Sequence, residues 1–225
     1  MIKENGKLEF LNTTAFLYIN NSMDLLNNRD LINESISDER INAIIFVFRN
    51  EDNSFNLNQQ QIFELYNWLQ SMPILSIAVM DNECYGDVLL LSMVCHIRLG
   101  GRDLSIQFSN KDSDIVFNFE EQCQLLMGKE TDRIYTSLLD TTINSKKALS
   151  ERLINQIIDM SNLEKEVQKF VNRIFGDKTD FQIRAIIKCF NNYKRYGINS
   201  DRSLLLEEEI NQFCNLAVKR NQYEN

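Results

Sequence analysis

The chain has 225 residues, which is enough for one sizeable core and too few for two full domains. Its formal net charge is −8, so a nucleic-acid surface is not expected. The N-terminus has no apolar run of signal-peptide length, and the longest nearly apolar run, DVLLLSMVCHI, is about half as long as a bilayer crossing requires. We therefore expect a cytoplasmic protein that binds neither nucleic acid nor membrane.

Three short stretches, 14–20, 41–48 and 74–80, are rich in β-branched and aromatic residues and almost continuously hydrophobic. Such stretches are typical of strands that are covered on both faces, as in a mostly parallel sheet. Between the second and third lies 58–72, in which apolar residues recur at helical spacing. The pattern predicts a βαβ unit and an α/β fold.

The segment 87–96 is apolar all round, which favours a fully buried helix. Asp87 would lie in its first turn, where a carboxylate interacts favourably with free N–H groups. The Gly100–Gly101 pair predicts a turn that leads into a further strand at 103–108, and 114–119 has a similar strand-like pattern.

The last third of the chain is expected to be helical. Two of its helices open with a capping box, and a third has an apolar stripe at helical spacing. These helices are 161–175 with Ser161 and Glu164, 179–196 with Thr179 and Gln182, and 204–220 with Leu206, Ile210, Phe213 and Ala217.

The cysteines are odd in number and lack C-x-x-C spacing, which predicts buried free thiols. They are Cys84, Cys95, Cys123, Cys189 and Cys214. The single histidine, His96, is expected to be structural, although a Cys84–His96 nucleophile pair is an alternative if the two lie close together. The chain contains no phosphate-binding loop, dinucleotide motif, zinc-protease motif or nucleophile elbow. We expect no metal and no cofactor.

The run MPILSIAVMDNECYGDVLLLSMVCHIRL resembles the central signature of the crotonase (enoyl-CoA hydratase/isomerase) superfamily. In that signature a strand leads through Asn-Gly and a Gly-Gly-Gly turn into a buried helix that ends in Ala-Cys-Asp-Ile-Arg. The positions that match there are Pro73, Ala78, Gly86, Leu91, Cys95, Ile97 and Arg98. Those that match in a second stretch are Gly128, Ala148, Leu149, Leu153, Ile154 and Asn155. The resemblance implies a crotonase-like ββα spiral core over 1–158 and a C-terminal helical trimerisation module of the same domain over 159–225.

The family's chemistry needs two backbone N–H groups that form an oxyanion hole and, in the hydratases, two glutamates. By the resemblance, the oxyanion positions fall on Asp87 and Phe55, and the glutamate positions fall on Leu90 and Asn110. Leucine cannot transfer a proton, and asparagine has no useful acid or base function. The resemblance therefore implies a shortened, divergent member with no assured catalytic residue.

A polar cluster at the turn before the buried helix has two interpretations. Glu83, Cys84, Tyr85 and Asp87 lie where a thioester carbonyl would sit in a relative, so a remodelled site would use Asp87, Glu83 and Tyr85. The other interpretation is a solvent-facing turn followed by a helix cap.

The resemblance implies two functions. The first is a catalytically degenerate crotonase-fold protein, a pseudoenzyme that serves as a structural partner in an acyl-thioester pathway. Such a protein would form a homotrimer or hexamer, or pair with an active crotonase. The alternative is a divergent lyase, isomerase or decarboxylase that acts on a CoA-bound or acyl-carrier-protein-bound thioester in polyketide-type biosynthesis.

Overall fold

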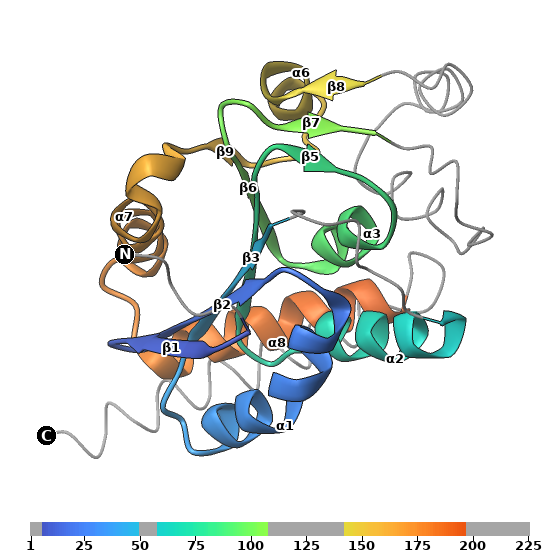
Figure 1. The fold of residues 1–225 in the computed structure, drawn as a ribbon. Helices are drawn as coiled ribbons and strands as arrows, with labels where there is room; N and C mark the ends of the chain where they lie inside the picture. Colours follow the sequence, from blue (N-terminus) through green and yellow to red (C-terminus); the bar gives the residue numbers. More distant parts are fainter. Residues whose placement is uncertain (1–5, 50–57, 108–141, 197–225) are drawn as a thin grey trace, which may run out of the picture.

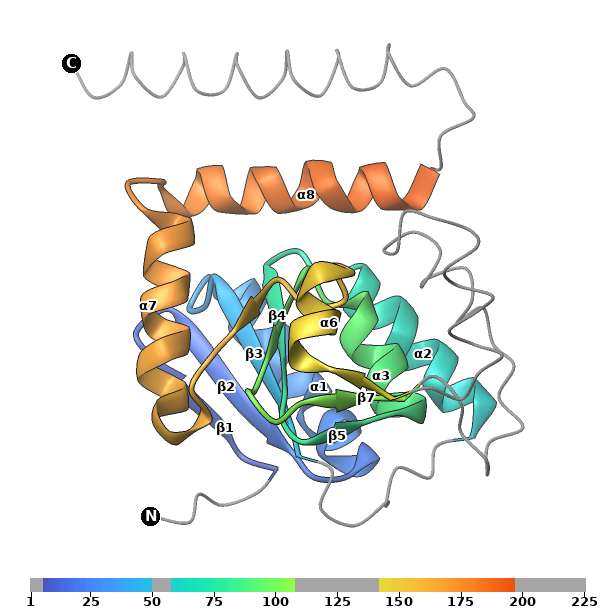
Figure 2. The same cartoon turned by 90° about the horizontal axis from the view of Figure 1, so that it is seen from above.

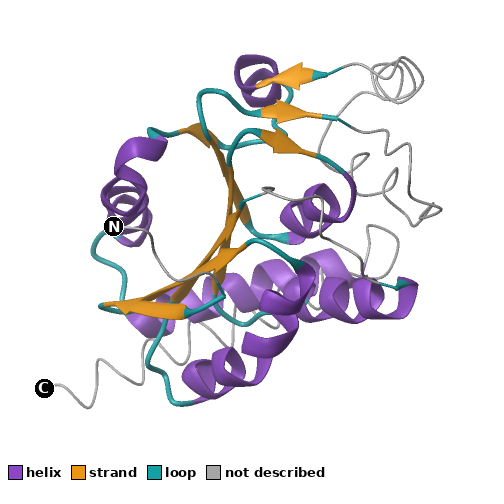
Figure 3. Ribbon diagram, in the orientation of Figure 1, coloured by secondary structure: helices purple, strands orange, loops and turns teal. Residues whose placement is uncertain are grey.

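The computed structural model describes residues 6–49, 58–107 and 142–196. Within these residues a six-stranded sheet, in the order β1-β2-β3-β4-β6-β9, runs through the centre of the fold (Figures 1 and 3). All neighbouring strands in it are parallel except β1 and β2, which form an antiparallel hairpin. The strands are β1 (Leu8–Leu11), β2 (Thr14–Ile19), β3 (Ala43–Phe48), β4 (Leu75–Met80), β6 (Ile97–Gly100) and β9 (Gln156–Ile157).

The central strands confirm the predicted α/β fold. Every residue of β2, β3 and β4 is buried, which explains why these stretches are apolar without alternation. The crossover helix α2 (Gln59–Gln70) joins β3 to β4 as predicted. Its N-terminus is closed by a capping box between Asn58 and Gln61.

Helices cover both faces of the sheet (Figures 1 and 2). On one face, α1 (Ser22–Ser37), α2 and α3 (Gly86–Val94) share a core with Leu17, Phe46 and Ala78 of the strands. The other face is covered by α7 (Leu163–Phe175), whose residues pack with those of the strands that point the opposite way. The residues of that second core include Phe16, Tyr18, Ile45, Val47, Val167, Phe170 and Val171.

The last described helix, α8 (Asp180–Tyr196), is held at the amino-terminal ends of the parallel strands. The Arg184 guanidinium donates a 2.8 Å hydrogen bond to the carbonyl of Ile41, just before β3. The Asn191 amide donates a 2.7 Å bond to the carbonyl of Met72, just before β4. The carboxyl ends of these strands therefore lie at the end of the sheet away from α8. Parallel sheets place their binding sites at the carboxyl ends of the strands.

Two expectations after β4 were wrong in detail. The buried helix α3 ends at Val94, and Ile97–Gly100 forms strand β6, so Gly100 ends a strand and is not part of a turn before one. The strand expected at 103–108 is only β7 (Ser105–Ile106). It pairs with two other short strands in a separate small sheet. These are β5 (Glu83–Cys84) and β8 (Ile143–Asn144), and α6 (Ser145–Ser150) follows β8.

One of the two predicted capping boxes exists. Thr179 and Gln182 exchange hydrogen bonds at the start of α8. Ser161 does not cap α7, because it lies in a short 3₁₀ helix, Met160–Asn162, and its hydroxyl donates to the carboxylate of Asp159. Among the described residues, no helix is both long and apolar enough to cross a membrane.

Candidate functional site

The turn between β4 and α3 lies at the carboxyl edge of the sheet. Asn82 has φ +53 there, and its carbonyl accepts a 2.8 Å hydrogen bond from the N–H of Ser105. Gly86 begins α3 with φ +56, a conformation that glycine adopts without the steric cost of a side chain. The matched glycine is therefore required by the backbone at the point where the helix starts.

The four residues of the polar cluster do not point toward one centre. Glu83 and Cys84 are neighbours in β5, so their side chains leave opposite faces of the strand, and Glu83 is exposed whereas Cys84 is buried. Tyr85 is the half-buried N-cap residue of α3 and makes no side-chain cap bond. Asp87 lies half-buried in the first turn of α3, as predicted.

Burial dominates the electrostatics of Asp87. The position near a helix N-terminus favours a carboxylate, but burial raises the pKa of Asp87 to about 6. A carboxyl group with such a pKa exchanges its proton near neutral pH. In its ionised form it places a poorly solvated negative charge at the start of α3.

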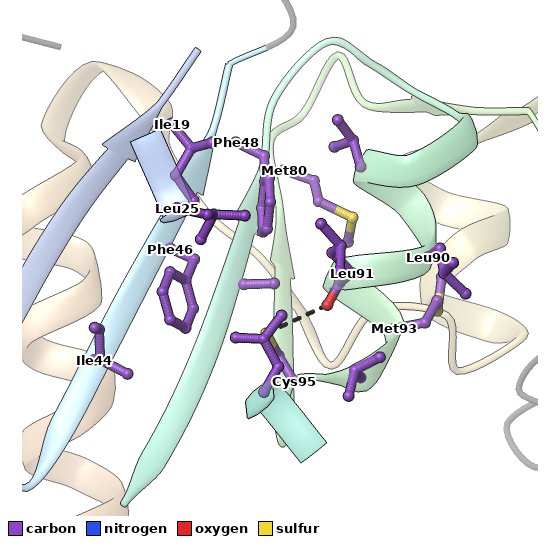
Figure 4. Close-up of a cluster of buried hydrophobic side chains, with 14 of the residues drawn as sticks. Ile19, Leu25, Ile44, Phe46, Phe48, Met80, Leu90, Leu91, Met93 and Cys95 are labelled. Carbon is purple, nitrogen blue, oxygen red and sulfur yellow. Dashed lines mark hydrogen bonds between the residues drawn. The ribbon is translucent and has the colours of Figure 1, made fainter. Parts of the chain in front are cut away.

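The position that the resemblance assigns to a family glutamate belongs to the hydrophobic core. Leu90 is 5% exposed and is part of the same cluster as Leu91 and Met93 of α3 and Cys95, the residue that follows the helix (Figure 4). All residues from Val88 to Val94 are buried. The described part of α3 therefore offers packing and no titratable group beyond Asp87.

Two predicted site positions, Phe55 and Asn110, lie outside the described residues, as do 114–119, Gly128, Cys123 and Cys214. The oxyanion position at Phe55 and the glutamate position at Asn110 therefore stay predictions. Of the three other cysteines, Cys84 and Cys95 are buried free thiols, as expected, whereas Cys189 is half-buried.

The Cys84–His96 nucleophile pair is not formed. The Cys84 thiol lies 3.4 Å from the sulfur of Met80, and burial raises the pKa of Cys84 to about 12. His96 Nδ1 accepts hydrogen bonds from the backbone N–H and the hydroxyl of Ser76, at 3.1 and 2.6 Å. His96 Nε2 lies 2.8 Å from Oδ1 of Asn191. Because Nδ1 accepts, Nε2 carries the proton and donates it to Asn191. His96 is thus a structural histidine.

A second polar group, not foreseen in the sequence, lies at the same edge of the sheet. Burial and the neighbouring Asp103 raise the pKa of Asp81, which directly follows β4. Arg49, which directly follows β3, acts on Asp81 in the opposite direction and lies 4.8 Å from the ring of Tyr18. The sequence could have pointed to Asp81 and Arg49, because each comes immediately after a buried strand. Within the described ranges, no group of three His, Cys, Asp or Glu residues is placed to hold a metal ion.

Many solved structures have the architecture of this chain. A putative enoyl-CoA hydratase/isomerase family protein from Hyphomonas neptunium is 13% identical, with a TM-score of 0.75 over 96% of this chain and 92% of that one. DspI from Pseudomonas aeruginosa is 17% identical, with a TM-score of 0.75 over 93% and 87%. ThnE from S. clavuligerus is 17% identical, with a TM-score of 0.69 over 83% and 91%.

The protein is therefore an α/β protein of the crotonase fold. It is a divergent example, because no protein-family model and no curated protein matches it. The likeness extends over nearly the whole length of the chain and of the related structures. At such identities the likeness establishes the fold, and the chemistry has to be argued from the residues.

Proposed function

We propose that this chain is a catalytically degenerate crotonase-fold protein that serves as a structural or interaction partner in an acyl-thioester pathway. The observation that carries the proposal is the first part of α3. Its first turn holds the half-buried carboxyl of Asp87, and the position expected for a proton-transferring glutamate holds buried Leu90.

The electrostatic argument concerns the charge that thioester chemistry creates. An enolate or oxyanion is stabilised by N–H groups and a positive helix end that are already in place. Above pH 6 the Asp87 carboxylate brings a negative charge to that helix end in a poorly solvated place, and this opposes a second negative charge there. Leu90 cannot supply or remove a proton.

The partner role is supported by the family-like residues that the chain retains in its core. Among the described residues, its matched positions lie in or beside the sheet, in α3 and in the stretch before α7, and most of them are buried in the core. Several of the similar structures are named enoyl-CoA hydratases or isomerases. We propose that the chain assembles with itself, as a trimer or hexamer, or with an active crotonase.

A divergent thioester enzyme is a second candidate, because one observation favours it. A carboxyl group with a pKa of about 6 is suited to proton transfer near neutral pH, and Asp87 has that property. In this case Asp87 would act in place of the missing glutamates, on a CoA-bound or carrier-protein-bound acyl group.

Calorimetric titration of the purified full-length chain with acetyl-CoA, crotonyl-CoA and pantetheine tests the proposal. We expect no heat of binding at millimolar ligand, and we expect a tagged chain to capture an active crotonase when the two are mixed or co-expressed. Saturable binding that changes in the Asp87→Asn variant, but not in the Asp103→Asn variant, would favour the enzyme instead.

A further inference from the structure

Strand β1 forms one edge of the central sheet (Figure 1). Among the described residues β1 pairs with β2 alone, so no strand lies on its other side. Phe10 and Leu11 of β1 are 47% and 42% exposed, and as neighbours in a strand they leave opposite faces of it. An edge strand with exposed apolar side chains can accept a strand from another chain.

The hydrogen bonds of β2 show in which direction its backbone groups point. The carbonyl of Ile19 accepts a 2.9 Å bond from the N–H of Arg49, on the side of β3. The carbonyl of Tyr18 accepts a 3.0 Å bond from the N–H of Gly6, on the side of β1. Because the direction alternates along a strand, the even-numbered residues of β2 point their backbone groups toward β1.

This alternation identifies the backbone groups that β1 presents to the open edge. In the hairpin register the even-numbered residues of β2 lie opposite Glu9 and Leu11. Glu9 and Leu11 therefore bond to β2, and the N–H and C=O groups of Leu8 and Phe10 point away from it. A strand that adds to this edge has to bond to Leu8 and Phe10.

The register of a second, antiparallel copy of β1 is restricted by its neighbours. A two-fold axis at Leu8 would use Gly6, whose N–H is already bonded to β2 and whose carbonyl accepts a 2.7 Å bond from Asn28. An axis at Glu9 would set two carboxylates directly opposite each other, which is unfavourable. An axis at Phe10 avoids both conflicts and sets the two exposed phenylalanine rings opposite each other.

We propose that two copies of this chain pair through β1, antiparallel and about a two-fold axis at Phe10, so that their central sheets become continuous. The N–H and C=O of each Phe10 then bond to those of the other copy. A second copy is the favoured occupant because the same segment supplies both halves of each interaction, and because a two-fold contact closes the edge against further addition. The inference is independent of whether the chain binds a thioester or an active crotonase.

Charge exchange at Phe10 tests the proposal. Phe10 is exposed in the single chain, so Phe10→Lys and Phe10→Glu should fold. Each variant alone sets like charges opposite each other, and we expect its mass in sedimentation at high protein concentration to be half that of the native assembly. A mixture of the two variants sets lysine opposite glutamate and should restore the native mass.

A matched control and a second readout accompany the charge exchange. Leu149→Lys, at a similarly exposed position on α6 and far from β1 in Figure 1, should leave the native mass unchanged. In the native protein, the amide protons of Leu8 and Phe10 should exchange with deuterated water about tenfold more slowly at high than at low protein concentration. The amide protons of Glu9 and Leu11 are bonded to β2 in both states and should change less.

Three results would overturn the proposal. The first is a native chain that sediments as a single chain at every concentration. The second is an assembly whose mass is the same in Phe10→Lys and Phe10→Glu as in the native chain. The third is protection of the Leu8 and Phe10 amides by a different protein and not by a second copy. Circular dichroism checks that each variant is folded, and the exchange measurement on the native chain keeps the test valid if a variant is not.

Discussion

The backbone N–H of Arg98 donates a 2.8 Å hydrogen bond to Oδ1 of Asn155, and the N–H of Asn155 donates a 2.7 Å bond to the carbonyl of Arg98. The buried Arg98 side chain adds bonds to the carbonyls of Leu153 and Cys95, at 2.8 and 3.1 Å. These residues belong to the two separate stretches that resemble the crotonase superfamily. Residues that match the superfamily in the two stretches therefore bond directly to one another. They connect strand β6 to the segment that leads into β9.

Replacing Arg98 should destabilise the fold. Arg98→Leu leaves the Leu153 and Cys95 carbonyls without this donor, and we expect the free energy of unfolding to fall by about 2–3 kcal/mol. Urea denaturation measures the change. Arg102→Leu, at an exposed arginine, is the control and should change stability by no more than about 0.5 kcal/mol. Equal effects of the two variants would contradict the structural role of Arg98.

Introducing a glutamate in place of Leu90 should not give the protein hydratase activity. Leu90→Glu puts a carboxyl group into the core, and we expect the free energy of unfolding to drop by about 3 kcal/mol or more. Leu90→Met keeps the volume and should cost less than about 1.5 kcal/mol. Denaturation and crotonyl-CoA hydration are measured on both variants. A stable Leu90→Glu variant that hydrates crotonyl-CoA would show that α3 still borders a working site.

Asp87 should make stability depend on pH in a defined direction. Its pKa is about 6 in the folded protein against an ordinary value of 3.8, so between these values the folded state binds more protons than the unfolded state. Stability therefore falls as pH rises from about 4 to about 6 and stays lowered above that. We expect Asp87→Asn to be more stable than the native protein at pH 7 by about 1 kcal/mol, after allowance for solvent screening, and equal to it at pH 4.

Asp159 should make stability depend on pH in the opposite direction. Hydrogen bonds from the Ser161 hydroxyl and backbone N–H lower the pKa of Asp159. This carboxylate therefore stabilises the fold above its ordinary pKa and loses that contribution as the pH falls. Asp159→Asn should thus be less stable than the native protein at pH 7, with the difference shrinking in acid. Denaturant unfolding at four pH values distinguishes the two carboxyl groups, and parallel curves for both variants would contradict the assignment.

The Cys84 thiol should be inert in the folded protein. Only the thiolate is nucleophilic, and at pH 8 a group with a pKa of about 12 is almost entirely protonated. Treatment with a small maleimide, followed by peptide mass spectrometry, should modify Cys189 first and Cys84 only after denaturant is added. Rapid labelling of Cys84 in the native state would mean that the turn before α3 opens.

The central strands were predictable because their burial leaves a simple mark in the sequence. Residues of β2, β3 and β4 face helices on both sides, so almost every position is apolar. The same continuous hydrophobicity prevented β6 from being predicted. Ile97–Gly100 continues the apolar run of α3 after only two residues, and hydrophobicity alone does not separate a buried helix from a buried strand.

Helix α1 was missed because its apolar stripe is interrupted. Leu25 and Ile32 are buried, but Asn28 lies between them on the same side. The amide of Asn28 donates to the carbonyls of Gly6 and Asp24, at 2.7 and 2.8 Å, so a polar residue occupies a core-facing position. The hydrogen bond to Gly6 comes from a distant part of the chain, and the local sequence gives no sign of it.

At the candidate site, sequence reasoning predicted the position of Asp87 but not its charge state. The place of Asp87 in the first turn follows from Gly86 and the apolar run behind it. Its raised pKa depends on how much of the carboxyl group is buried by the folded chain, which is a three-dimensional property. For the same reason, the opposite directions of Glu83 and Cys84 became clear only when β5 was found to pair with β7.

Hydration of crotonyl-CoA by the purified full-length protein, followed by the loss of enoyl-thioester absorbance at pH 5, 6, 7 and 8, tests the central claim most directly. The account predicts a rate equal to that of buffer at every pH, for the native chain and for Asp87→Asn alike. A rate above buffer that disappears in Asp87→Asn and persists in Asp103→Asn would contradict it and would identify Asp87 as a catalytic group.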